Sequence, residues 1–243
     1  MRFLIALQFL TIIPVRIRRR FGPADLAGSM IYFPAVGIFL GLVLAAMHAA
    51  AVAILPPLVA GIILTGVLAF LSGGLHLDGL ADTADAFFSG GSVQKKLRIM
   101  KDSRIGAMGA IAVSLCLFMK AALIGSLDGS IAFGALLLMP AASRCCLLLP
   151  AFAFRYGRDT GTGRPFITAL SLRTVVVASG ATLIVTGGVL GLHGLASLTL
   201  TAVTALGVGR ILSRNLGGMT GDTLGAVNEL GEIVFLTALL ILR

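Results

Sequence analysis

Long runs of hydrophobic residues, separated by short polar breaks, dominate the chain. A helix needs about 20 residues to cross the hydrocarbon core of a bilayer, and most of these runs approach or exceed that length. Backbone amides in lipid must be hydrogen-bonded within their own segment, so we expect the runs to be helices. The pattern predicts an all-α, polytopic integral membrane helical bundle of about seven spans (six to eight), near residues 31–54, 57–75, 106–126, 131–153, 174–192, 195–213 and 226–242.

The first apolar run, residues 1–14, differs from the others because it is short and several arginines follow it. A secretory signal carries its positive charge before the apolar stretch, so the order here is reversed. We therefore expect an N-terminal helix that is interfacial or re-entrant. No second domain or internal repeat is evident, and residues 1–243 are interpreted as a single membrane-embedded domain.

Composition supports the membrane interpretation. Hydrophobic residues make up 58% of the chain and charged residues only 12%, whereas soluble domains carry about 25% charged residues. This balance excludes a soluble enzyme, a disordered tail and a disulfide-stapled secreted module. Cys116, Cys145 and Cys146 lie in apolar runs without metal-ligand spacing, so we interpret them as packing residues.

Positive charge is distributed unevenly between the two sides of the predicted bundle. Of the 19 Lys and Arg residues, sixteen fall in the N-terminal arm and in or at the edge of the loops on one side, at 76–105, 154–173 and 214–232, the last with Arg210 and Arg214 at its start. Because basic loops stay in the cytoplasm, this side is predicted to be cytoplasmic. The formal net charge of +9 thus indicates topology rather than nucleic-acid binding.

Seven of the ten acidic residues gather in this same predicted side, in two motifs and the loop between them. On a helix, Asp78, Asp82 and Asp85 share an arc of about 60°. Like charges on one stripe repel, and a divalent cation relieves that conflict, with oxygen ligands favouring Mg²⁺, Ca²⁺ or Mn²⁺ over zinc. The second motif repeats this logic with Asp222, Glu229 and Glu232.

Two basic segments accompany the acids. The first, residues 99–106, offers Lys101 and Arg104 beside Asp102, and this combination suits a metal-bound diphosphate. The second, residues 155–165, contains Arg155, Arg158 and several glycines. This second loop could hold nucleotide phosphates or anchor the protein to anionic lipid.

The two acidic motifs also carry a family resemblance. The segments HLDGLADTADAFFSGG (76–91), IMKDSRIGAMG (99–109) and GGMTGDTLGAVNELGE (217–232) resemble the signature of the cobalamin synthase family, the adenosylcobinamide-GDP ribazoletransferases. FLTIIPV and SMIYFPAVGIFLG near the N-terminus are also similar to that family. Ala86 is a mild departure, because glycine is the more usual residue there, but every carboxylate is in place.

The resemblance implies a Mg²⁺-dependent transferase, with Mn²⁺ as an alternative ion, in the cytoplasmic (inner) membrane of a bacterium. Its substrates would be adenosylcobinamide-GDP and α-ribazole or its 5′-phosphate, its products adenosylcobalamin or its 5′-phosphate and GMP. We expect no nucleic-acid partner, and an oligomer is compatible with the sequence. Two alternatives remain open: a CDP-alcohol phosphotransferase-like enzyme, although its DGxxAR step is missing, and a cation-coupled transporter.

Roles within the site are hypotheses on this basis. The metal ligands are expected to be Asp78, Asp82, Asp222 and Glu229, and the general base is expected to be Asp85 or Asp102. The expected substrate-binding residues are His76, Lys101, Ser103, Arg104 and Glu232. His76 could instead orient a neighbour, and His48 and His193 are interpreted as structural.

Overall fold

A computed structural model describes residues 1–18, 21–129, 131–158 and 160–243, so Arg19, Arg20 and Asp159 of the charge analysis lie outside the described residues. These residues form helices and contain no strand, only an isolated bridge between Tyr156 and Met219. The helices are α1 (Arg2–Leu10), α2 (Pro23–Ser29), η1 (Met30–Tyr32), α3 (Phe33–Ala51), α4 (Pro57–Leu71), α5 (Leu75–Phe88), α6 (Val93–Ile99), α7 (Ala107–Gly125), α8 (Ala132–Cys146), α9 (Leu148–Ala153), α10 (Arg164–Thr168), α11 (Leu172–Leu216) and α12 (Gly221–Leu242).

The predicted all-α membrane architecture is confirmed. Within the described residues, five helical stretches are long and apolar enough to cross a membrane: Pro23–Ala51, α7, Ala132–Ala153, α11 and α12. A sixth candidate joins α4 to α5 through a bend of 92°. The predicted segment 57–75 is therefore not a simple span, because α4 has only 15 residues before the chain turns into the more polar α5.

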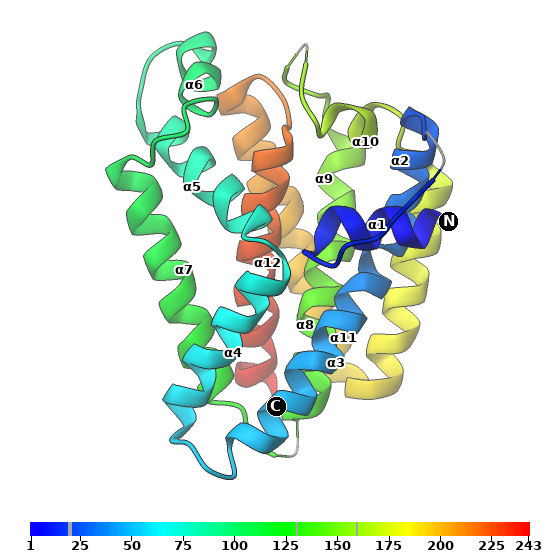
Figure 1. Cartoon of the computed structure of the whole chain (residues 1–243), viewed down its shortest axis with the longest axis vertical. Coiled ribbons are helices and arrows are strands. Elements are labelled where there is room, and N and C mark those ends of the chain that lie inside the picture. The colour runs from blue at the N-terminus through cyan, green and yellow to red at the C-terminus, as the bar shows by residue number, and fades with distance from the viewer. Residues whose placement is uncertain (19–20, 130, 159) are drawn as a thin grey trace.

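The 45-residue α11 contains two predicted segments, 174–192 and 195–213. Helical geometry breaks at Gly191, whose φ of 56° is a left-handed value that glycine adopts without steric cost. The first half descends one side of the bundle, and the second half returns to the end where α6 lies (Figure 1). This helical hairpin brings the C-terminal end of α11 next to the N-terminus of α12.

The interior of the bundle is built around α8, whose side chains Leu136, Leu138 and Met139 are fully buried. The nine-residue α1 lies crosswise against the long helices (Figure 1) and is too short to span, as expected for an interfacial helix. A hydrogen bond from the Ile12 backbone N–H to the Leu71 carbonyl, 2.9 Å, holds the end of this arm at the α4–α5 bend. The arm is thereby fixed beside the first acidic motif.

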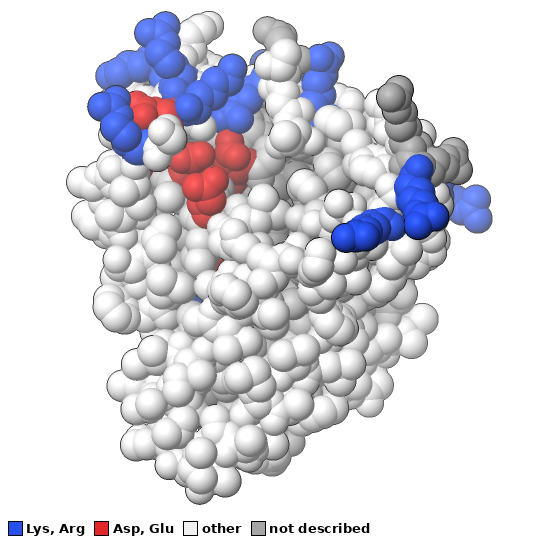
Figure 2. Space-filling model, in the orientation of Figure 1, with Lys and Arg blue, Asp and Glu red and all other residues white. Residues whose placement is uncertain are grey.

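Charged residues concentrate at one end of the molecule. Figure 2 shows Lys and Arg gathered over α6 and the neighbouring loops, with a group of acidic side chains directly beneath them. The opposite end of the same face shows no charge. This separation agrees with the distribution of basic residues along the sequence.

Candidate active site

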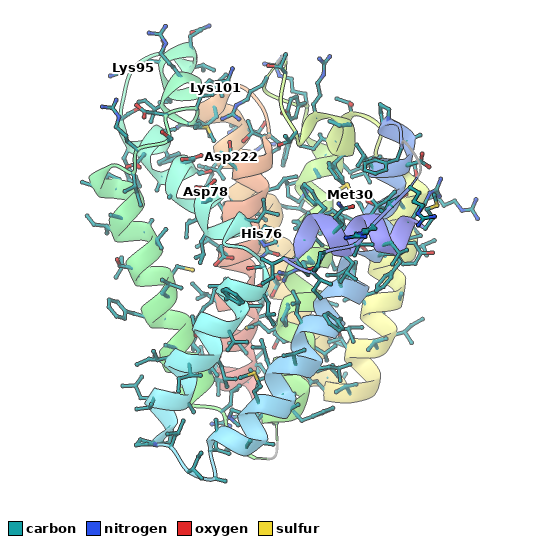
Figure 3. The ribbon with its side chains drawn as sticks, in the orientation of Figure 1. Met30, His76, Asp78, Lys95, Lys101 and Asp222 are labelled. Atoms are coloured by element: carbon teal, nitrogen blue, oxygen red, sulfur yellow. The ribbon has the colours of Figure 1, made fainter. Side chains whose placement is uncertain are left out.

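The two acidic motifs meet where α5 crosses the beginning of α12. A Cβ at Gly79 would lie 2.6 Å from the carbonyl oxygen of Asp222, so only glycine allows the two backbones to approach this closely. At the start of α12, Thr220 and Thr223 exchange side-chain-to-backbone hydrogen bonds in a capping box. Asp222 is thus held in the first turn of α12, close to Asp78 of α5 (Figure 3).

Asp82 of α5 is one of the carboxylates that this contact brings together. It is within electrostatic range of Asp78, Asp85 and Asp222, and its one basic neighbour in this set is Arg158. We call Asp78, Asp82 and Asp222 the acidic cluster. Among the described residues, no three His, Cys, Asp or Glu side chains lie close enough together to coordinate one ion on their own.

The loop between α9 and α10 is part of this site. The Gly157 N–H donates to the Met219 carbonyl, and the Met219 N–H donates to the Arg155 carbonyl, both at 2.8 Å. Arg158 Nη2 lies 2.9 Å from Asp222 Oδ2. The sequence left open whether this loop binds phosphate or lipid, and the structure places it directly against the second acidic motif.

A basic cavity of about 580 Å³ opens between α6 and this loop. Arg98, Lys101, Arg155 and Arg158 all line it, so Lys101 lies where a substrate-binding cation is expected. Arg98 was not singled out from the sequence, whereas Arg155 and Arg158 belong to the loop for which phosphate and lipid were both left open. Tyr156 also lines the cavity, and burial raises the pKa of its hydroxyl, which stays protonated as a hydrogen-bond donor at neutral pH.

A second, smaller cavity of about 190 Å³ lies on the other side of the acidic cluster. Its walls are mostly apolar and come from α1, η1, α3, α5, the junction between α8 and α9, α10 with the loop before it, and α12. The lining residues are Phe9, Leu10, Met30, Phe33, Leu75, His76, Asp78, Leu147, Thr162, Gly163, Phe166, Gly221, Asp222, Leu224 and Gly225. Asp222 lines this apolar cavity while its ion-pair partner Arg158 lines the basic one, so the pair forms a boundary between them.

Glu229 and Glu232 do not join the acidic cluster. Lys120 Nζ lies 2.5 Å from Glu229 Oε2 and 2.5 Å from Glu232 Oε2, and Arg144 Nη1 lies 3.1 Å from Glu232 Oε1. All four side chains are buried between α7, α8 and α12. Glu229 is therefore not placed to bind a metal ion at the acidic cluster, and Glu232 is not placed to contact the substrate there. Both belong to a buried ion-pair quartet with Lys120 and Arg144.

The two candidates for the general base are both engaged elsewhere. Arg104 donates side-chain and backbone hydrogen bonds to Asp102, and these lower the pKa of the Asp102 carboxyl to about 2. A carboxylate of such low basicity is a poor proton acceptor. Ser103 and Arg104 lie on the same exposed turn, and neither lines the basic cavity.

Asp85 instead caps a helix. Its two carboxylate oxygens accept the Gly106 and Gly109 N–H groups, at 2.7 and 2.8 Å, at the N-terminus of α7. A negative charge there satisfies unpaired donors and complements the helix dipole. Asp85 therefore joins α5 to α7, and its oxygens are already occupied.

Replacing Asp85 by Asn should lower the free energy of unfolding by about 0.5–2 kcal/mol, the usual loss for a helix cap. One oxygen becomes an N–H₂ group that faces another donor. The three free cysteines are all buried, so a thiol-reactive fluorescent dye reports thermal unfolding in detergent. Asp102→Asn, on the exposed turn, should leave the midpoint nearly unchanged; an equal loss in both variants would contradict the capping role.

Comparisons with known proteins agree with these motifs. The family described as cobalamin-5-phosphate synthase matches residues 2–240. A Syntrophobacter fumaroxidans protein named adenosylcobinamide-GDP ribazoletransferase is 39% identical over 236 residues, 96% of this chain and 95% of that protein. Proteins of the same name from Klebsiella pneumoniae and Escherichia coli are each 38% identical, over 98% and 96% of this chain and 98% and 97% of their own lengths. No solved structure matches the chain. The similar proteins are transferases by name, which favours neither the transporter nor the CDP-alcohol alternative.

Proposed function

The chain belongs to the cobalamin-5-phosphate synthase family, and from that membership we propose that it joins adenosylcobinamide-GDP to ribazole in cobalamin biosynthesis, releasing GMP. The structural observation that carries this proposal is the meeting of two acidic motifs beside a cavity lined by four cations. Such a site suits a substrate that contains a diphosphate. Whether the acceptor is α-ribazole or its 5′-phosphate, the bond that forms is the same.

In the proposed reaction, a ribose hydroxyl of the acceptor attacks the phosphorus that carries the cobinamide. A new P–O bond forms, the bond to the bridging oxygen of the diphosphate breaks, and GMP leaves with that electron pair. The hydroxyl proton passes to a carboxylate. Catalysis of such a transfer depends on positioning and on neutralising the phosphate charge.

The basic cavity is the proposed site of the GDP portion. Arg98, Lys101, Arg155 and Arg158 present their charges to one space, and guanidinium groups match phosphate oxygens in a bidentate geometry. Arg158 is also paired with Asp222. The phosphorus that reacts would therefore lie next to the acidic cluster when the diphosphate occupies the cavity.

Magnesium is a proposal drawn from the donor set. The acidic cluster offers hard carboxylate oxygens, and Mg²⁺ is usually bound by one or two carboxylates together with substrate phosphates rather than by a complete protein cage. Asp78 and Asp222, which line the same cavity, are the proposed ligands. A bound Mg²⁺ supplies neutralisation of charge on the phosphate oxygens. With Asp85 and Asp102 engaged elsewhere, Asp82 is left to accept the hydroxyl proton.

The test of this function is an assay of purified protein with adenosylcobinamide-GDP, α-ribazole 5′-phosphate and Mg²⁺. We expect release of GMP together with the cobalamin product, loss of both with EDTA, and recovery when Mg²⁺ or Mn²⁺ is restored. Absence of product from folded protein, under conditions in which a relative is active, would refute the proposal. Activity that persists in EDTA would remove the metal from it.

We further propose that the charged end of the bundle, with the site, faces the cytoplasm of the bacterial cell. Lys95 is exposed on α6 at that end, and Ile54 is 80% exposed in the α3–α4 turn at the other. A membrane-impermeant thiol reagent should label Lys95→Cys only from the cytoplasmic side and Ile54→Cys only from outside. The natural cysteines are buried and should stay silent. The reverse pattern would overturn the orientation.

A further inference from the structure

The apolar cavity beside the acidic cluster has a composition that the transfer reaction alone does not explain. Three phenylalanine rings from α1, α3 and α10 converge on it. The rings of Phe9 and Phe166 are stacked with centroids 4.4 Å apart, and each lies 6.1 Å from the ring of Phe33. Stacked aromatic walls favour a flat aromatic ligand over an alkyl chain.

His76 adds a polar group to this cavity. The side chain is only 6% exposed, and its Nδ1 has no hydrogen-bond partner among the described residues. A buried polar atom without a partner is costly, so it calls for an explanation such as a missing ligand. Because Nδ1 can donate or accept, it can pair with a nitrogen of a heteroaromatic ring.

From these two observations we propose that the apolar cavity binds the benzimidazole base of the ribazole acceptor. The proposal rests on the proposed function and deepens it. The base lies against Phe9, Phe33 and Phe166, and its free ring nitrogen, the one not attached to ribose, forms a hydrogen bond with His76. The base is thus recognised by shape and by one nitrogen.

The position of the cavity suits the chemistry. Asp78 and Asp222 line it together with His76, so a ribose attached to a bound base would extend toward the acidic cluster. The Arg158–Asp222 ion pair separates this cavity from the basic one. The acceptor hydroxyl and the donor diphosphate would therefore approach the same carboxylates from opposite sides.

The size of the cavity argues for the base rather than the corrin. Cavities for drug-sized ligands occupy about 300–1,000 Å³, and this one measures about 190 Å³. A bicyclic base is a fragment of that scale, whereas a corrin ring with its side chains is far larger. A lipid chain would leave His76 without a partner.

Ligand binding can be followed optically because the protein has no tryptophan and only two tyrosines. Titration of detergent-solubilised protein with α-ribazole, without donor substrate, should change the fluorescence of the benzimidazole as it binds. We expect Phe166→Leu, which keeps an apolar side chain but removes a ring, to raise the acceptor Kd and KM by about 3- to 10-fold. The KM for adenosylcobinamide-GDP should stay the same.

His76→Phe tests the hydrogen bond separately. The variant should bind α-ribazole about 10-fold more weakly, yet bind the matching indole riboside, which lacks the free nitrogen, as well as the wild type does. Phe118→Leu is the matched control, since that ring is 72% exposed on α7 and outside the cavity. It should leave both substrates' constants unchanged.

The outcomes separate this inference from the proposed function. Suppose that the wild type forms product and that the thiol-dye assay shows Phe166→Leu and His76→Phe to be folded. If these two variants then bind α-ribazole as tightly as the wild type does, the cavity does not hold the base. A rise in the KM for adenosylcobinamide-GDP alone would also overturn it. If α-ribazole binds with the expected variant effects but no product forms, the base site stands and the proposed function fails. A variant that does not fold is replaced by Phe9→Leu, at a ring that is 36% exposed.

Discussion

Asp82→Asn is expected to reduce turnover by about 10²–10⁴-fold, the usual contribution of a general base, while the protein stays folded. Asp82 is surrounded by Asp78, Asp85 and Asp222, and Arg158 is the one cation in this set of neighbours. Asn has nearly the same shape but cannot accept the hydroxyl proton. Because the substitution also removes like-charge repulsion, the midpoint of thermal unfolding should stay equal or rise.

This combination of lost activity and retained stability is characteristic of a residue kept for function. The measurement pairs initial rates of GMP release with thiol-dye unfolding in the same preparation. Asp25→Asn is the control, because Asp25 is a partly exposed carboxylate at the start of α2 and lines neither cavity. Turnover within a few-fold of wild type in Asp82→Asn would exclude Asp82 as the base, and a large loss in Asp25→Asn would show that the assay reports general damage.

The acidic motifs illustrate what the sequence could predict about the site. Helical spacing placed Asp222, Glu229 and Glu232 on one face of a helix, and that part is correct. The same spacing places Glu229 about 10 Å further along the axis than Asp222, at roughly 1.5 Å per residue. Because α12 runs into the bundle, this displacement takes Glu229 from the charged end into the interior. The angular spacing of residues around a helix does not show how deep in the bundle each residue lies.

A signal for the buried quartet was nevertheless present in the sequence. Lys120 and Arg144 are basic residues well inside predicted spans, several residues from either end, and a cation inside a membrane bundle needs an anion. Glu229 and Glu232 are the acids inside the last span. Pairing the basic residues inside the spans with the acidic residues inside the last span would have predicted the quartet.

The basic cavity could not be predicted in the same way. It depends on the contact between the α9–α10 loop and the turn before α12, two segments about 60 residues apart in sequence that are joined through backbone hydrogen bonds. Hydrogen bonds between backbone groups do not require particular side chains, so the sequence shows only the glycines that allow the two segments to approach. Lys101 was expected in the site from its neighbours, and Arg155 was a candidate phosphate or lipid contact, whereas the place of Arg98 on the cavity wall required the fold.

Lys120→Met is expected to destabilise the protein by about 3–5 kcal/mol, the usual result of removing one partner from a buried ion pair. Lys120 contacts both Glu229 and Glu232, so the substitution leaves the two buried carboxylates of the quartet with one cation, Arg144. Total stabilities of about 5–15 kcal/mol leave little margin for such a loss. We expect a sharp fall in the yield of folded protein and in the midpoint of thermal unfolding.

A second substitution in the quartet should restore part of the stability that Lys120→Met loses. In Lys120→Met/Glu229→Gln, the remaining Arg144–Glu232 pair is neutral, so the double variant should be more stable than Lys120→Met alone, although each substitution removes a native contact. Lys95→Met, on the exposed surface of α6, is the matched control and should unfold like the wild type. If the double variant is less stable than Lys120→Met alone, charge balance is not what the quartet contributes. In that case the loss of stability in Lys120→Met would come from the packing of the Lys120 side chain against α12, and the destabilisation caused by Glu229→Gln would add to it.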